Sequence, residues 1–201
     1  MIYIVTTKNI PKPRGRPRQF DPEQATEVAQ QLFHARGYDD VSVADVTDAL
    51  GIKTPSFYSA FGSKAGLYNR VIERYSTRGA IPLTDLLLPE RPVVECLTAL
   101  LEDTARRYAA NPDAPGCIVL EGCHSNDAEA RTAARAAHAA AEQVICDYIA
   151  ARYPEQASAI SAYVSTVMNG LSAKARMGQS QDALLSSARL ASLALAQALP
   201  A

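Results

Sequence analysis

Side chains that could act as a nucleophile, a base or a metal ligand gather between Cys117 and His124. A cysteine beside a histidine can form a nucleophile–base pair, or supply two ligands of a zinc site. A zinc site would need a second pair of ligands, and none accompanies Cys117, Cys123 and His124 at a suitable spacing. A catalytic pair would need an Asp or Asn placed to orient the histidine, and the sequence offers none. We therefore expect no enzyme, no metal and no cofactor. Two interpretations of the thiols stay open, either inert packing or a redox or electrophile sensor, which would need an acidic, exposed thiol.

A second group of side chains suits DNA. The first 18 residues carry five Lys and Arg and no acid, and residues 12–18 read KPRGRPR. This segment resembles the Arg-Gly-Arg-Pro core of an AT-hook, whose arginines lie in the narrow, electronegative minor groove of A·T-rich DNA. We predict a flexible basic arm over residues 1–19 in which Arg14, Arg16 and Arg18 bind DNA. The alternative is a disordered, solubilising tail.

The charge of the chain is divided unevenly, although the net charge is only -1. Residues 1–80 carry 11 Lys and Arg against 8 Asp and Glu, whereas residues 81–201 carry 9 against 13. This division is typical of a small DNA-contacting module joined to a neutral or acidic body. With 48% apolar and 20% charged residues, the 201-residue chain has the composition of a folded globular protein.

Helical periodicity dominates the sequence, which predicts an all-α fold of about nine helices. The first four expected helices are Pro22–Arg36, Ser42–Leu50, Thr54–Phe61 and Ser63–Arg78. Their expected N-caps are Asp21, Ser42, Thr54 and Ser63, and they end at Gly37, Gly51, Gly62 and Gly79. Five more helices are expected over residues 93–110, 117–124, 128–152, 155–177 and 181–199. The two short helices joined by residues 50–53 have the dimensions of a helix-turn-helix, whose second helix enters the major groove of DNA. The same spacing alone also fits a plain α-hairpin.

Three segments decide between these two interpretations. LFHARGY at 32–38, SVADV at 42–46 and GIKTPSFYSAFGSK at 51–64 together resemble the signature of the tetracycline-repressor-like (TetR/AcrR) family, and the match runs over residues 20–72. The resemblance implies a one-component transcriptional regulator, a repressor that binds a palindromic operator as a dimer and is released by a small-molecule effector. Ser59 and Ala60 replace the larger residues that often follow the tyrosine in the family, which affects the base readout.

Carried over by position, the resemblance implies that Ser42, Tyr58 and Lys64 contact phosphates. Residues at or near base edges would be Lys53, Thr54, Pro55, Ser56 and Ser59. Helix N-termini attract phosphate, and a lysine or a phenol can bind a phosphate oxygen, so the chemistry agrees. Phe57 and Phe61 are expected in the core.

A boundary between two domains is expected near residue 80. Gly79 and the prolines that follow it predict a helix-turn-helix domain at 20–80 and a helical ligand-binding and dimerisation domain at 81–201. The family resemblance implies a homodimer through the last two helices. Their composition agrees, because small residues permit close helix approach and Val164, Leu171, Leu184 and Leu195 would form the apolar seam. The alternative is that these helices only cap the core of a single chain. Polar or soft side chains in the body are candidates for effector contacts. These are Tyr108, Cys117, Glu121, Cys123, His124, Tyr163 and Met168.

Location and class follow from what the sequence lacks. There is no apolar run of 18 residues and no secretory leader, and the four cysteines show no paired spacing, so we expect a cytoplasmic protein with no membrane contact. A rival binding protein stays open: an architectural, sequence-tolerant DNA binder would have similar affinity for all A·T-rich DNA, whereas a repressor needs a strong specificity ratio.

Overall fold

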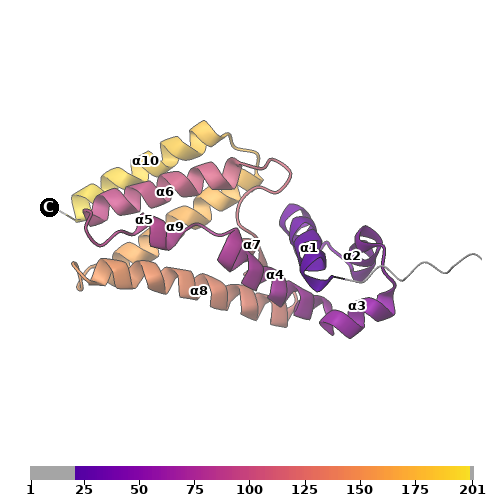
Figure 1. Cartoon of the computed structure of the whole chain (residues 1–201). Coiled ribbons are helices and arrows are strands. Elements are labelled where there is room, and N and C mark those ends of the chain that lie inside the picture. The colour runs from indigo at the N-terminus through magenta and orange to yellow at the C-terminus, as the bar shows by residue number, and fades with distance from the viewer. Residues whose placement is uncertain (1–20, 200–201) are drawn as a thin grey trace, which may run out of the picture.

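The computed structural model describes residues 21–199, and every regular element in that range is a helix. The ten helices confirm the all-α prediction (Figure 1). The predicted arm with Arg14, Arg16 and Arg18 lies outside the described residues. The helices are α1 (Pro22–Arg36), α2 (Val43–Leu50), α3 (Thr54–Phe61), α4 (Lys64–Arg78), α5 (Leu83–Leu86), α6 (Val93–Ala109), α7 (Ile118–Gly122), α8 (Ala128–Ala150), α9 (Ala157–Arg176) and α10 (Gln181–Ala198).

Capping side chains begin most of the N-terminal helices, as predicted. Asp21 accepts from the backbone of α1, Ser42 and Asp45 form a complete capping box on α2, and Ser63 caps α4. One detail is corrected. Lys53, rather than Thr54, is the N-cap of α3, and its side chain makes no capping bond, so Thr54 is already helical. The helix α5 was not predicted, because a single turn leaves no periodicity to read.

The helices α1 to α3 form a small group at one end of the molecule, and α4 joins that group to the rest (Figure 1). Phe33, Phe57 and Leu67 are fully buried and come from three different helices, which shows where the core of this end lies. The helix α4 packs against α1 on one side and against α8 on the other. Because α4 belongs to both packing layers, the boundary predicted at residue 80 follows its end and does not separate two independent cores.

The other end consists of α6, α9 and α10 packed together, with α8 beneath α9. The predicted dimer seam needs a correction here. Val164, Leu171, Leu184 and Leu195 are all buried within the single chain, in the layer where α9 and α10 pack on α6. Their periodicity reflected packing inside one chain. None of the helices between residues 21 and 199 has the length and hydropathy that a membrane span requires.

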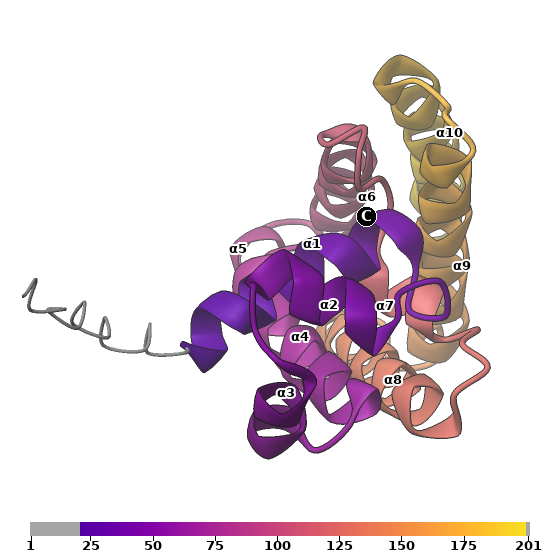
Figure 2. The same ribbon diagram turned by 90° about the vertical axis from the view of Figure 1, so that its right-hand side faces the viewer.

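The outward sides of α9 and α10 carry apolar and small residues. Figure 2 shows these two helices side by side at one edge of the molecule. Leu190 and Leu193 on α10 are each 68% exposed, and Met177 at the end of α9 is 77% exposed. Along α9, small exposed residues recur every three or four positions and so lie on one side of the helix. They are Ala159, Ala162, Thr166, Gly170 and Ala173.

Candidate DNA-binding surface and effector cavity

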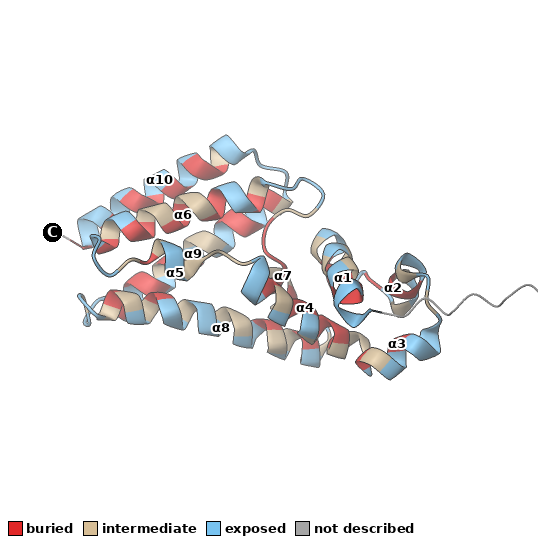
Figure 3. Ribbon diagram, viewed as in Figure 1, coloured by how far each residue is buried: buried red, intermediate tan, exposed pale blue. Residues whose placement is uncertain are grey.

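The second of the two short helices, α3, turns its polar side outward. Phe57 and Phe61 are buried, with their ring centroids 5.4 Å apart, and they anchor the helix to the core. The predicted contact residues of this helix and its cap are all exposed (Figure 3). They are Lys53, Thr54, Pro55, Ser56, Tyr58 and Ser59. A short helix held by one aromatic face, with small polar groups on the other, can enter a groove without obstruction.

The turn before α3 is fixed by backbone geometry. Gly51 has φ 62, in the left-handed region, and its N–H donates to the carbonyls of Thr47 and Asp48. The Ile52 N–H donates to the Thr47 carbonyl oxygen at 3.0 Å. Because residues with a side chain rarely adopt this φ, glycine at position 51 sets the angle between α2 and α3.

Tyr58 places its hydroxyl in solvent while its ring is packed. Its ring stands edge-on to Phe57, with the centroids 5.3 Å apart, and half of the residue stays exposed. A phenol held in this way can hydrogen-bond a phosphate oxygen at little entropic cost.

Ser42 lies at the exposed start of α2, where its hydroxyl caps the helix and contacts Asp45. The hydrogen bonds from Ser42, followed by that from Arg36, hold the pKa of Asp45 well below its usual range. The Arg36 Nη1 to Asp45 Oδ1 distance is 3.0 Å. The carboxylate therefore stays charged next to the predicted phosphate contact at Ser42.

Lys64 has a structural role that the sequence did not reveal. Its Nζ lies 3.0 Å from each of the carbonyl oxygens of Tyr38 and Val41, and 4.0 Å from the centroid of the Tyr38 ring. Two of the three N–H groups of the ammonium are thus directed into the loop between α1 and α2, which leaves one for a phosphate. Phosphate binding by Lys64 stays a prediction.

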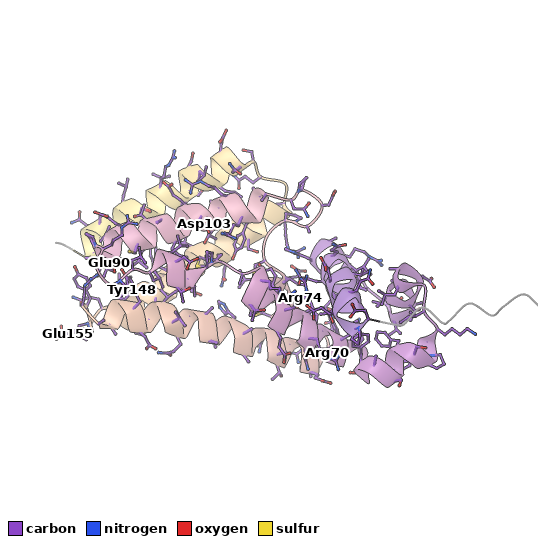
Figure 4. The ribbon with its side chains drawn as sticks, in the orientation of Figure 1. Arg70, Arg74, Glu90, Asp103, Tyr148 and Glu155 are labelled. Atoms are coloured by element: carbon purple, nitrogen blue, oxygen red, sulfur yellow. The ribbon has the colours of Figure 1, made fainter. Side chains whose placement is uncertain are left out.

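The C-terminal end of α3 is held by Arg70 of α4, which sequence reasoning missed (Figure 4). The Arg70 guanidinium donates to the Ala60 carbonyl oxygen at 3.1 Å and lies 5.2 Å above the ring of Phe61. In the sequence, Arg70 is one basic residue among several, and only the fold shows that its guanidinium binds the carbonyl end of α3. Arg70 thus makes the orientation of α3 depend on α4.

A cavity of about 680 Å³ lies between α4, α5, α6, α7, α8 and α9. Its wall combines aliphatic residues such as Ile81, Leu120 and Ile145 with polar and charged residues such as Thr84, Asp85 and Arg107. Of the seven predicted effector contacts, Tyr108, Cys117 and Met168 line it. A cavity that offers apolar surface together with polar groups can hold a small molecule.

The other four predicted contacts lie outside the cavity lining. Glu121 pairs with Arg176 at 3.1 Å, and the Tyr163 hydroxyl donates to the Ala191 carbonyl oxygen at 3.3 Å. The His124 Nδ1 lies 3.2 Å from the carbonyl oxygen of Leu120. Cys123 is partly exposed, and burial raises the pKa of its thiol. Cys117 and His124 therefore do not face one site, and no three His, Cys, Asp or Glu side chains in the described part of the chain are grouped to hold a metal ion.

The structure adds polar lining groups that were not predicted. On one wall, the Ser165 hydroxyl donates to Glu142 Oε2 at 3.3 Å, and His138 Nε2 lies 3.7 Å from the same oxygen. On another wall, the Tyr75 hydroxyl donates to Cys117 Sγ at 3.6 Å, and Tyr108 lines the same cavity. No periodicity in the sequence indicates that residues from six helices converge, so this set could not be recognised beforehand.

Hydrogen bonds join the cavity wall to the N-terminal helices. His34 Nε2 on α1 lies 3.1 Å from the carbonyl oxygen of Gly116, the residue before Cys117. Arg176 of α9 donates to the His34 carbonyl oxygen at 3.1 Å. Burial is the main reason that the pKa of His34 is lowered. The neutral imidazole thus fixes α1 against the segment that begins α7.

Known proteins resemble both ends of the chain. The family model described as "Bacterial regulatory proteins, tetR family" matches residues 25–71. The HTH-type transcriptional repressor BdcR of Escherichia coli K12 is 52% identical over 191 residues, covering 95% of this chain and 97% of that protein. The repressor ComR of the same organism is 26% identical, covering 90% and 91%.

A solved structure extends the comparison to three dimensions. It contains a cysteine mutant of the TetR family transcriptional regulator CifR, complexed with 26-bp double-strand operator DNA. The TM-score is 0.80 at 28% identity, and the alignment covers 89% of this chain and 99% of that one. The similarity therefore includes the helices around the cavity as well as the N-terminal group.

Proposed function

The chain belongs to the TetR family of bacterial regulatory proteins, and from this premise we propose that it is a transcriptional repressor which binds a palindromic operator as a homodimer and leaves it when a small molecule binds. The observation that carries the proposal is the exposed polar side of α3 above its buried Phe57 and Phe61. Small side chains at the start of a recognition helix let its N-terminal end approach base edges.

Two kinds of DNA contact are proposed on this surface. Lys53, Thr54, Pro55, Ser56 and Ser59 would lie at or near base edges and determine sequence preference, whereas Ser42, Tyr58 and Lys64 would hold phosphates and set the register. Arg14, Arg16 and Arg18 would add minor-groove contacts from the arm, residues 1–19. The support is the exposure of the α3 residues and the chemistry of each side chain.

We propose that the homodimer forms through the outward sides of α9 and α10. The twofold symmetry of such a dimer matches the symmetry of a palindromic operator. Leu190, Leu193 and Met177 are the large apolar side chains exposed there, and Gly170 has open space around it. Isolated apolar residues on a surface are ordinary, but a two-helix face of leucine and small residues packs well against its own copy. Two linked recognition helices then bind two half-sites together.

The effector would bind in the cavity and act through α4. Tyr75, Thr77 and Arg78 of α4 line the cavity, while Arg70, further back in the same helix, holds α3. A molecule that alters the position of α4 therefore alters the spacing of the two recognition helices in the dimer. This linkage supports a division of labour between a DNA-binding domain at 20–80 and a ligand-binding and dimerisation domain at 81–201, with α4 as their shared element.

The test of the proposed function is selection of bound DNA from a random pool, followed by a screen for compounds that release the selected sequence. We expect enrichment of an inverted repeat, and a specificity ratio of about 10³ or more over scrambled DNA. Equal affinity for all A·T-rich DNA would instead favour an architectural protein. A matched variant, Ser56→Ala, should change the base preference within each half-site and leave affinity for scrambled DNA unchanged.

A further inference from the structure

Cys117 is a nucleophilic group that the proposed function does not yet use. It stands at the start of α7, it is 8% exposed, and it lines the cavity. Its backbone N–H donates to the Ser172 hydroxyl oxygen at 3.0 Å, which fixes the residue against α9. The thiol is therefore shielded from bulk solvent, unlike the exposed thiol expected of a sensor, and a small molecule reaches it only by entering the cavity.

Cys117 shares the cavity wall with two phenols that are themselves buried. Tyr108 is 4% exposed and Tyr75 is 7% exposed, and the Tyr75 hydroxyl donates to Sγ at 3.6 Å. Burial is the main reason that the pKa values of both phenols are raised, so both remain neutral hydrogen-bond donors. The Tyr75 hydroxyl can therefore donate to the negative charge that develops on sulfur as it attacks carbon.

The same sulfur is connected to the N-terminal helices by two short routes. Tyr75 belongs to α4, so its contact with Sγ joins the cavity directly to the helix that holds α3. The neighbouring Gly116 carbonyl receives the hydrogen bond from His34 of α1. A group attached to Sγ would take the space of the Tyr75 hydroxyl, and would thereby disturb α4 and the segment that α1 contacts.

We propose that Cys117 is the covalent acceptor for soft electrophilic effectors, α,β-unsaturated carbonyl compounds, and that the adduct releases the protein from DNA. This inference rests on the proposed repressor function, and it assigns the class of effector and the atom that recognises it. The aliphatic part of the cavity wall suits the carbon skeleton of such a compound, and Tyr108, which lines the same cavity, can donate to its carbonyl oxygen.

The chemistry is an addition that needs no oxidant. The thiol S–H bond breaks, and the sulfur electron pair forms an S–C bond at the β-carbon. The carbon–carbon π pair moves to the α-carbon side as an enolate, which takes up one proton. The product is a thioether that contains every atom of the thiol and the enone, so atoms and electrons balance.

The other three cysteines provide internal controls. Cys123 and Cys146 are partly exposed, and Cys96 is buried, with its thiol directed at the Leu88 carbonyl oxygen at 3.7 Å. None of the three lines the cavity. If exposure alone governed reaction, Cys123 and Cys146 would react before Cys117, so the order of modification distinguishes a site from an accessible thiol.

The experiment uses the full chain with benzylideneacetone, an aromatic enone, and with benzylacetone, its saturated analogue of nearly the same shape. Intact mass and peptide mapping identify the adduct, and fluorescence anisotropy measures affinity for the selected operator. We expect one enone per chain at Cys117, together with a fall in DNA affinity by a factor of about 5 to 150. Cys117→Ser and Cys117→Ala should bind operator normally and resist the enone, whereas Cys123→Ser and Cys146→Ser should respond as the wild type does.

The outcomes separate this inference from the proposed function. Release of Cys117→Ser by the enone, or an adduct at Cys117 without loss of DNA affinity, would overturn the inference while the repressor function stands. Equal release by benzylacetone would also overturn it, because the effector would then act without a covalent bond. Release by hydrogen peroxide with no response to the enone would assign oxidation instead of addition. Failure of the untreated protein to prefer any DNA sequence would overturn the proposed function itself.

Discussion

The apolar positions of α10 make the dimer proposal quantitative. Leu190 is 68% exposed in the single chain, so association can bury about two thirds of its side chain. Full burial of a leucine contributes roughly 1.5 to 3 kcal/mol, which gives about 1 to 2 kcal/mol for Leu190 and about 2 to 4 kcal/mol for its two copies in a twofold dimer. Leu190→Ala should therefore raise the dimer Kd by a factor of about 30 to 1,000.

Leu190→Arg should separate the chains further, because each copy would also place an unpaired cation in the interface. Sedimentation velocity across a dilution series measures the dimer Kd. Far-UV circular dichroism and thermal melting at a concentration where both proteins are monomeric check the fold. The matched control is Ala136→Arg, which adds the same charge at an exposed position of α8. This control should leave the dimer Kd unchanged.

A substitution in the buried layer gives the opposite pattern. Leu195 is fully buried within the chain, so Leu195→Ala should cost about 2 to 5 kcal/mol of folding free energy. Its primary effect would be on unfolding of the single chain. If Leu190→Arg leaves the wild-type Kd intact, or lowers the melting temperature of the monomer as strongly as Leu195→Ala does, the assignment of this face to the dimer is wrong.

Four further predictions concern the DNA-binding end. Lys64→Ala should lower the free energy of unfolding by about 2 kcal/mol, because two charge-assisted hydrogen bonds to backbone carbonyls are lost. Urea denaturation measures this change, and unchanged stability would contradict it. Because the pKa of buried His34 is lowered from 6.5, the unfolded chain binds the extra proton, so the stability contributed by neutral His34 is present above pH 6.5 and declines as the pH falls below that value. His34→Gln should flatten this part of the pH dependence, and an unchanged slope would refute it. Tyr58→Phe should weaken binding to all DNA alike, whereas Thr54→Ala should change the preferred base, which affinities for a panel of operator variants distinguish. Deleting residues 1–18 should reduce affinity more for operators with A·T flanks than with G·C flanks, and equal losses would leave only a charged tether.

Local signals in the sequence were sufficient for every described helix except α5 and for the exposed side of α3. The Ser42 and Asp45 capping box and Gly51 are local chemistry, so they indicate the same structure in isolation as in the fold. The exposed side of α3 follows from the spacing of Phe57 and Phe61, which marks the opposite side as core. Local patterns of this kind are preserved because neighbouring residues along one helix decide them.

Long-range packing explains what the sequence could not indicate. The apolar stripes containing Leu171 and Leu195 require a partner, but periodicity does not say whether the partner is α6 of the same chain or a second copy. The helix α7 is too short for its facing direction to be read, so Glu121 was grouped with Cys117 although it pairs with Arg176. The phosphate contact predicted for Lys64 came from the family resemblance and from its place at a helix start, whereas its contacts with the loop before α2 depend on the tertiary structure.

The spacing of two half-sites tests the central claim most directly, because the proposal requires two recognition helices held at a fixed separation by one dimer. The affinity of the full chain is measured for the selected operator and for the same operator with about 5 bp, half a helical turn, inserted at its centre. We expect the insertion to lower affinity to the level of scrambled DNA, since the second half-site then faces away from the second α3. Equal affinity for the original and the expanded operator would show that one dimer does not hold two recognition helices at a fixed separation.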